Sequence, residues 1–174
     1  RLFMNQNTQY GIAYWNLSFE SDTLANAQKA LEVTERTLEC CDYTRYELYY
    51  GYALHNLGEI QRHVARVTDS KKNLNEAIDN YKKALEIFDM ENYPYEYSFT
   101  YQDIGDAYRH LAEIENLEGN LQKAYKAYAE ALRVREKNDY IYGYSETLMS
   151  IAEADLLQGR TNNDFDALER AEKS

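Results

Sequence analysis

The sequence has very little proline and glycine. It contains one proline and seven glycines among 174 residues, whereas turns and strand connections draw heavily on both residue types. Their scarcity excludes a protein built from many tight turns and predicts an all-α fold. The hydrophobic content of 44% is enough to form a sizeable buried core.

Long apolar runs and positive charge are also scarce. No stretch reaches the ~18 apolar residues that could cross a bilayer. The 19 basic residues are outnumbered by 30 acidic ones, which leaves a net charge of −11. Because nucleic acids and anionic membrane surfaces are bound through an excess of lysine and arginine, neither is an expected partner. We expect a protein or peptide partner, and a basic one would suit the negative charge.

Cysteine is nearly absent. Cys40 and Cys41 are the only two and are adjacent. Neighbouring side chains on a helix point about 100° apart, so a bridge between these two would be strained and would close no useful loop. This arrangement predicts reduced thiols in a cytoplasmic protein.

What the sequence does contain is an internal repeat of forty-seven residues. Arg62-His63 recurs as Arg109-His110, and an ungapped alignment of residues 47–93 with 94–140 has twelve identities where about three would arise by chance. Weaker matches continue in both directions. We therefore predict one repeat domain over residues 1–174, with units 1–46, 47–93, 94–140 and a partial unit 141–174, belonging to a longer chain.

Each unit is expected to be a pair of helices. Apolar residues have helical spacing from Leu54 to Val67 and again from Leu74 to Phe88. Such a pair cannot bury both of its faces alone, so the units must stack into a solenoid of about three and a half repeats, with seven to eight helices.

Small and large residues recur where the two helices of a unit should meet. Gly58 and Gly105 leave space on the first helix for close approach of the second. Tyr81 and Tyr128 recur where a bulky group is needed. Four further tyrosines include candidates for exposed contacts with a partner: Tyr49, Tyr95, Tyr101 and Tyr142.

Helix ends have their own signals. Asn73 followed by Glu76 is typical of an N-cap with its capping-box partner. Pro94 can start a helix but not lie within one. Gly119 and Gly159 are expected to end helices.

The repeat resembles the tetratricopeptide repeat. That family has a large residue and then a small one on the first helix, with an aromatic residue three positions further on. Alanine, an aromatic and alanine follow on the second helix. The clearest matches are Ile104-Gly105, Tyr108, Ala124, Tyr128 and Ala131, then Leu57-Gly58, Ala77, Tyr81 and Ala84. The unit is longer than the usual ~34 residues, and Gln61 replaces an aromatic. The length is similar to that of extended archaeal and bacterial arrays. Armadillo and HEAT-type units have comparable lengths but lack the glycine and alanine-tyrosine-alanine pattern.

The resemblance implies a right-handed superhelix of antiparallel helix pairs, whose first helices line a groove that holds a peptide or helix of a partner. The protein would then be an interaction scaffold without a cofactor. The alternative is a sensing or docking array of a larger regulatory protein with its effector domain elsewhere. The groove positions that the resemblance implies are Tyr52, His55, Asn56, Glu59, Arg62 and His63 in one unit, and Phe99, Gln102, Asp103, Asp106, Arg109 and His110 in the next.

Other interpretations of these residues stay open. The recurring arginines could simply pair with Glu59 and Asp106, three residues earlier on the same helix. His63 and His110 could approach each other, but a metal site would need further ligands. No phosphate loop or nucleophile motif occurs, so we do not expect an enzyme. Uncapped ends would allow copies of the chain to associate end to end.

Overall fold

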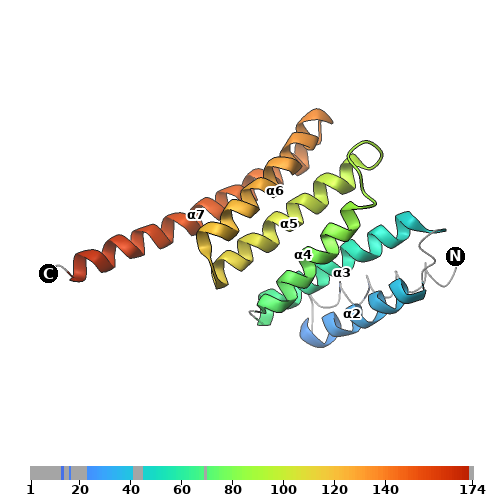
Figure 1. Cartoon of the computed structure of the whole chain (residues 1–174), viewed down its shortest axis with the longest axis horizontal. Helices are drawn as coiled ribbons and strands as arrows, with labels where there is room; N and C mark the ends of the chain where they lie inside the picture. Colours follow the sequence, from blue (N-terminus) through green and yellow to red (C-terminus); the bar gives the residue numbers. More distant parts are fainter. Residues whose placement is uncertain (1–12, 14–15, 17–22, 41–44, 69, 173–174) are drawn as a thin grey trace.

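The described part of the chain is entirely helical in its regular structure. The computed structural model describes residues 13, 16, 23–40, 45–68 and 70–172, with side chains up to residue 160. Its helices are α2 (Thr23–Cys40), α3 (Glu47–Thr68), α4 (Lys71–Leu85), α5 (Pro94–Ile114), α6 (Leu117–Lys137) and α7 (Ile141–Glu172) (Figure 1). The all-α prediction is confirmed there, with six helices in these ranges where seven to eight were expected.

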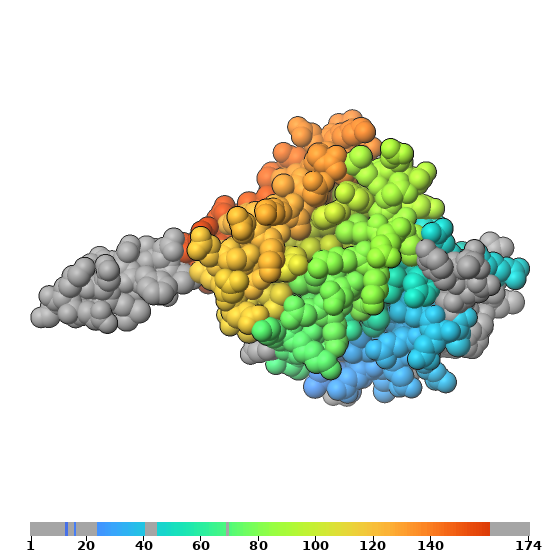
Figure 2. Space-filling model, in the orientation of Figure 1, coloured from blue at the N-terminus to red at the C-terminus, as the bar shows by residue number. Residues whose placement is uncertain are grey.

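Helices that follow one another in the sequence lie side by side. Each of α2 to α6 packs against the next helix, and α5 also contacts α3 and α7. The surface accordingly shows the sequence colours in order from one end of the molecule to the other (Figure 2). The helices α3, α5 and α7 begin at Glu47, Pro94 and Ile141, one repeat length apart. The first helices of successive units are therefore neighbours in space.

One glycine–tyrosine contact joins the two helices in each of the two central units. A Cβ built on Gly58 would lie 2.7 Å from the ring of Tyr81, and one on Gly105 would lie 2.3 Å from the ring of Tyr128. Both tyrosines are fully buried. The close approach predicted from the recurring glycines is thus present, because a side chain at either position would occupy the space that the tyrosine ring fills.

The predicted helix ends are partly wrong. The N-cap of α4 is Ser70, whose side chain accepts a hydrogen bond from the backbone N–H of Asn73 at 3.3 Å. Asn73 is therefore the third residue of the helix. Asn116, in the left-handed conformation with φ 44°, caps α6 through the N–H of Gly119. Gly119 thus lies in the first turn of α6 and ends no helix, while Pro94 starts α5 as expected.

The fourth unit also differs from the expected helix pair. The helix α7 runs without a break from Ile141 to Glu172, through Gly159. A glycine ends a helix by adopting positive φ, and no described glycine does so. Past the helices it contacts, α7 continues alone (Figure 1). Apolar side chains are also exposed earlier in α7, among them Ile141, Met149 and Leu156.

Replacing Gly105 by alanine should destabilise the protein. The added methyl group would collide with the buried ring of Tyr128, which is held by neighbours on all sides. We expect Gly105→Ala to lower the free energy of unfolding in urea by about 1 to 3 kcal/mol. Gly159→Ala is the matched control, because no atom lies within 4 Å of a Cβ built at this position. This substitution should raise the free energy of unfolding by about 0.5 to 1 kcal/mol. Equal effects of the two substitutions would contradict the proposed role of Gly105.

Candidate functional site

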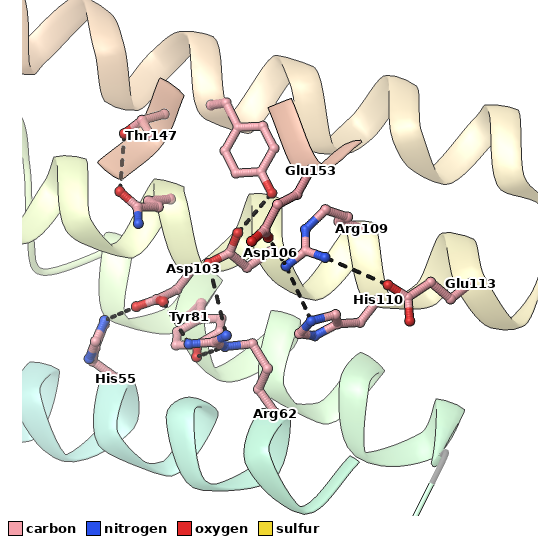
Figure 3. Close-up of polar contacts among 12 residues, drawn as sticks. His55, Arg62, Tyr81, Asp103, Asp106, Arg109, His110, Glu113, Thr147 and Glu153 are labelled. Atoms are coloured by element: carbon pink, nitrogen blue, oxygen red, sulfur yellow. Dashed lines mark hydrogen bonds and ion pairs between the residues drawn. The ribbon is translucent and has the colours of Figure 1, made fainter. Parts of the chain in front are cut away.

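A buried carboxylate joins the first helices α3 and α5. Asp103 of α5 is 4% exposed, and two side chains of α3 converge on it (Figure 3). His55 Nε2 lies 2.9 Å from its Oδ2, and Arg62 Nη2 donates to its Oδ1 at 3.0 Å. Arg62 Nε also donates to the hydroxyl of Tyr81 at 3.4 Å. One arginine therefore connects both helices of its own unit to the next unit.

A second type of ion pair recurs at the repeat length. Arg62 Nη1 lies 3.9 Å from Asp106 Oδ2, and Arg109 Nη2 lies 3.0 Å from Glu153 Oε2 on α7. Both pairs span forty-four residues. The hydroxyl of Tyr128 donates to Asp106 at 2.8 Å. The recurring arginines thus form a ladder, in which each arginine pairs with an acid of the following unit.

Burial shifts the ionisation of this network. It raises the pKa of the Tyr81 and Tyr128 hydroxyls, so both stay protonated. Burial alone would lower the pKa of Arg62, but Tyr81 and the carboxylates of Asp103 and Asp106 outweigh it, and the pKa is raised. For His55, burial lowers the pKa, but the hydrogen bond to Asp103 and the charge of Asp103 raise it by more than burial lowers it. The net shift of the His55 pKa is therefore upward.

The ladder settles how the predicted groove arginines pair within the chain. They do not pair with the acid three residues earlier on their own helix. Arg62 reaches to α5, and Arg109 reaches to Glu153 and, at 3.6 Å, to Glu113 one turn ahead. The side chain of Gln102 also forms hydrogen bonds within the chain, because its Oε1 accepts from Arg135 and Thr147. Beside the ladder, His63 has a lowered pKa through burial and the charges of Arg66 and Arg62.

On one side of the ladder lies a hollow of about 250 Å³, called here the aromatic pocket. It is lined by four predicted residues of α3, namely Tyr52, His55, Asn56 and Glu59, and by Tyr95 and Phe99 of α5. The rings of Tyr95 and Phe99 are stacked, with centroids 6.1 Å apart. The Tyr52 hydroxyl donates to Glu96, another lining residue. Burial and this hydrogen bond raise the pKa of Tyr52 to about 12.

On the other side lies a larger hollow of about 780 Å³, called here the arginine groove. Its basic residues are Arg66 of α3, Arg109 of α5 and Arg160 of α7, accompanied by His110. Arg109 can only donate, so the His110 Nε2 at 3.3 Å must accept and the ring proton lies on Nδ1. That buried Nδ1 has no partner among the described residues. Burial and the nearby arginines lower the pKa of His110 to about 3.

Several lining residues were missed by the sequence analysis. The helical period could have found Arg66 and Glu113, because each lies four residues beyond a repeated arginine on the same face. Thr100 and Thr147 recur with the repeat, which is a second available signal. Nothing in the sequence distinguishes Glu96 from the other acids.

Comparison with known proteins matches this chain to no family model and to no curated protein. The tetratricopeptide resemblance is therefore carried by the residues of the repeat alone. In the described ranges, no helix is long and apolar enough to cross a membrane. Within the same residues, no three histidine, cysteine, aspartate or glutamate side chains are grouped to hold a metal ion.

Removing the Arg62 charge should cost more stability than removing that of Arg109. Arg62→Met leaves the buried Asp103 without its counter-charge, and we expect a loss of about 3 kcal/mol in the free energy of unfolding. Arg109→Met leaves Glu113 and Glu153, which are half exposed and can be solvated, so the loss should be below about 1 kcal/mol. Urea unfolding of both variants measures this difference. A similar loss in both would contradict the central role of Arg62.

His110 should make the protein less stable in mild acid. Its folded pKa of about 3 lies below the value of about 6.5 in an unfolded chain. Between these values the unfolded chain binds one more proton, so stability falls as the pH drops through this window. From pH 7 to 5 this residue should cost about 2 kcal/mol.

The comparison of wild type with His110→Gln isolates this effect in urea unfolding at both pH values. His55, whose pKa is raised, has the opposite sign: its stabilisation is complete below about 6.5 and is lost as the pH rises through its folded pKa. That contribution is the same in both proteins and cancels. Parallel pH profiles of the two proteins would show that His110 accepts a proton in the fold.

Proposed function

We propose that the chain is a binding scaffold that holds a peptide or helix of a partner protein along the face of its first helices. The observation that carries the proposal is one continuous face with a hollow on each side of the arginine ladder. On α3 this face runs through Tyr52, His55, Glu59, Arg62 and Arg66, residues three or four apart. Side chains with this spacing lie on one side of a helix.

The α5 helix supplies the matching edge of the same face. Tyr95 and Phe99 line the aromatic pocket, whereas Arg109 and Glu113 line the arginine groove. The α3 helix has 22 residues, which corresponds to about 33 Å. A partner lying along it could reach both hollows, so an extended segment or a helix of several turns would fit better than a compact small molecule.

Both hollows offer groups that a partner could use. Tyr95 is 57% exposed and stands at the aromatic pocket, and tyrosine and arginine are frequent in the energetically dominant parts of interfaces. In the arginine groove, the Nδ1 of His110 and the Nε of Arg109 have no acceptor among the described residues. Carbonyl or carboxylate oxygens of a bound segment would supply one.

The tetratricopeptide resemblance supports the same proposal. A solenoid of helix pairs requires three features that are present here: neighbouring first helices, the glycine–tyrosine contacts and the 47-residue spacing of helix starts. In such an array the first helices line the inner surface, and most residues of both hollows belong to α3, α5 and α7. We propose this architecture for the units from Glu47 onward, with α7 as a long final helix.

Selection from a phage-displayed library of random peptides tests the proposal. Binders should have dissociation constants of about micromolar or lower, and in isotope-labelled protein they should shift amide resonances of α3 and α5. Arg66→Ala and Tyr95→Ala should each weaken binding by about tenfold. Lys126→Ala, which removes an exposed cation from α6, should have no effect. Binders that shift only resonances of α4 and α6 would contradict the proposal.

A further inference from the structure

In the part of the chain that the structure describes, one acid of a recurring set lies outside any ion pair. Glu59, Asp106 and Glu153 recur at the repeat length. Asp106 and Glu153 each pair with an arginine forty-four residues earlier. The corresponding position for Glu59 is Trp15, which cannot neutralise a carboxylate. Among the described residues Glu59 forms no ion pair, and it lines the aromatic pocket.

The aromatic pocket has walls that suit a positive charge. Tyr52 and Phe88 form one side, with ring centroids 5.2 Å apart, and Phe99 with Tyr95 forms another. Aromatic faces attract ammonium and guanidinium groups through their quadrupoles. A second carboxylate, Glu96, is held at the pocket by the Tyr52 hydroxyl. Both kinds of group, aromatic rings and carboxylates, favour a cation over a neutral or acidic ligand.

A buried hydroxyl in the same pocket also lacks a partner. Thr100 is 0% exposed, lines the aromatic pocket, and its Oγ1 has no hydrogen-bond partner in the described part of the chain. An apolar occupant would leave this hydroxyl and the Glu59 carboxylate desolvated and unpaired, which is costly. An ammonium group has three N–H donors and no acceptor. It could satisfy both groups at once.

The size of the pocket limits what can enter. A volume of about 250 Å³ is below the ~300 to 1,000 Å³ of pockets that enclose drug-sized molecules, but it has room for one long side chain. Two described cations lie near Glu59, but Arg62 is paired with Asp103 and Asp106, and His55 is paired with Asp103. Both act on the Glu59 carboxylate only through their charge, without forming an ion pair with it. We infer that the aromatic pocket binds a basic side chain, lysine or arginine, of a partner segment lying on the face of α3 and α5.

This inference rests on the proposed scaffold function, yet it can be tested without a partner. The probe is n-butylammonium chloride, which has the functional end of a lysine side chain, and n-butanol is its neutral counterpart. Titration of isotope-labelled protein should give saturable shifts at the amides of Phe99 and Thr100 with n-butylammonium, and none with n-butanol. The absence of saturable shifts with n-butylammonium would overturn the inference and leave the scaffold proposal standing.

Two nearly isosteric variants identify the groups responsible. Glu59→Gln removes the charge but keeps the shape, and should weaken n-butylammonium binding by about tenfold, the loss of one charge-assisted hydrogen bond. Thr100→Val removes only the hydroxyl and should weaken it by a smaller factor. Glu136→Gln changes the net charge equally at an exposed position of α6 and should leave binding unchanged. Equal losses in Glu59→Gln and Glu136→Gln would mean that only the overall charge attracts the probe.

The peptides selected on the scaffold provide the second arm. Lysine or arginine should be enriched at one position, and its replacement by norleucine should weaken binding to the wild type about tenfold but to Glu59→Gln hardly at all. Binders without any basic preference would overturn the inference alone. A selection that yields no binder, together with saturable n-butylammonium binding, would overturn the scaffold proposal and leave the cation site established.

Discussion

The ion pair between Arg62 and Asp103 is the interaction on which the arrangement of the first helices depends. Burying two charges is costly, and the cost is offset only when both are paired and hydrogen-bonded. Here Asp103 receives Arg62 and His55 from α3, while Arg62 also contacts Tyr81 of α4 and Asp106 of α5. A sideways slip of α3 against α5 would break several of these contacts together, so the network defines the register of the two helices.

The same network explains why the two hollows differ in charge. Arg62 and Arg109 each pair with an acid of the next unit. In the aromatic pocket, Glu59 forms no ion pair with any described residue. Toward α7, the arginine groove contains Arg66 and Arg160 beside Arg109, whose charge is paired with Glu113 and Glu153. The aromatic pocket is therefore lined by carboxylates without an arginine, whereas in the arginine groove Arg66 and Arg160 exceed the paired charges.

The spacing of repeats made much of the helical fold predictable, because glycine, alanine and tyrosine recur wherever two helices must pack closely. The N-cap was misplaced because Ser70 and Asn73 are both good caps, and only the path of the chain between helices decides between them. The pairing of Arg62 could not be predicted either. As partners of Arg62, an acid three residues away and an acid forty-four residues away are equally plausible until α3 and α5 are known to be neighbours. Glu96 could not be predicted for the same reason, because it reaches Tyr52 only when α3 and α5 are neighbours.

Rigidity of the ladder has a consequence for recognition. Tyr52 pairs with Glu96 and Arg62 with Asp106 at the same separation of forty-four residues, so α3 and α5 run in the same direction over this face with a constant offset. The aromatic pocket and the arginine groove are consequently held at a nearly fixed distance from one another. A partner segment that places a basic residue in the first and an acidic one in the second would bind without reorganising the scaffold, whereas one with the charges reversed would meet repulsion at both ends.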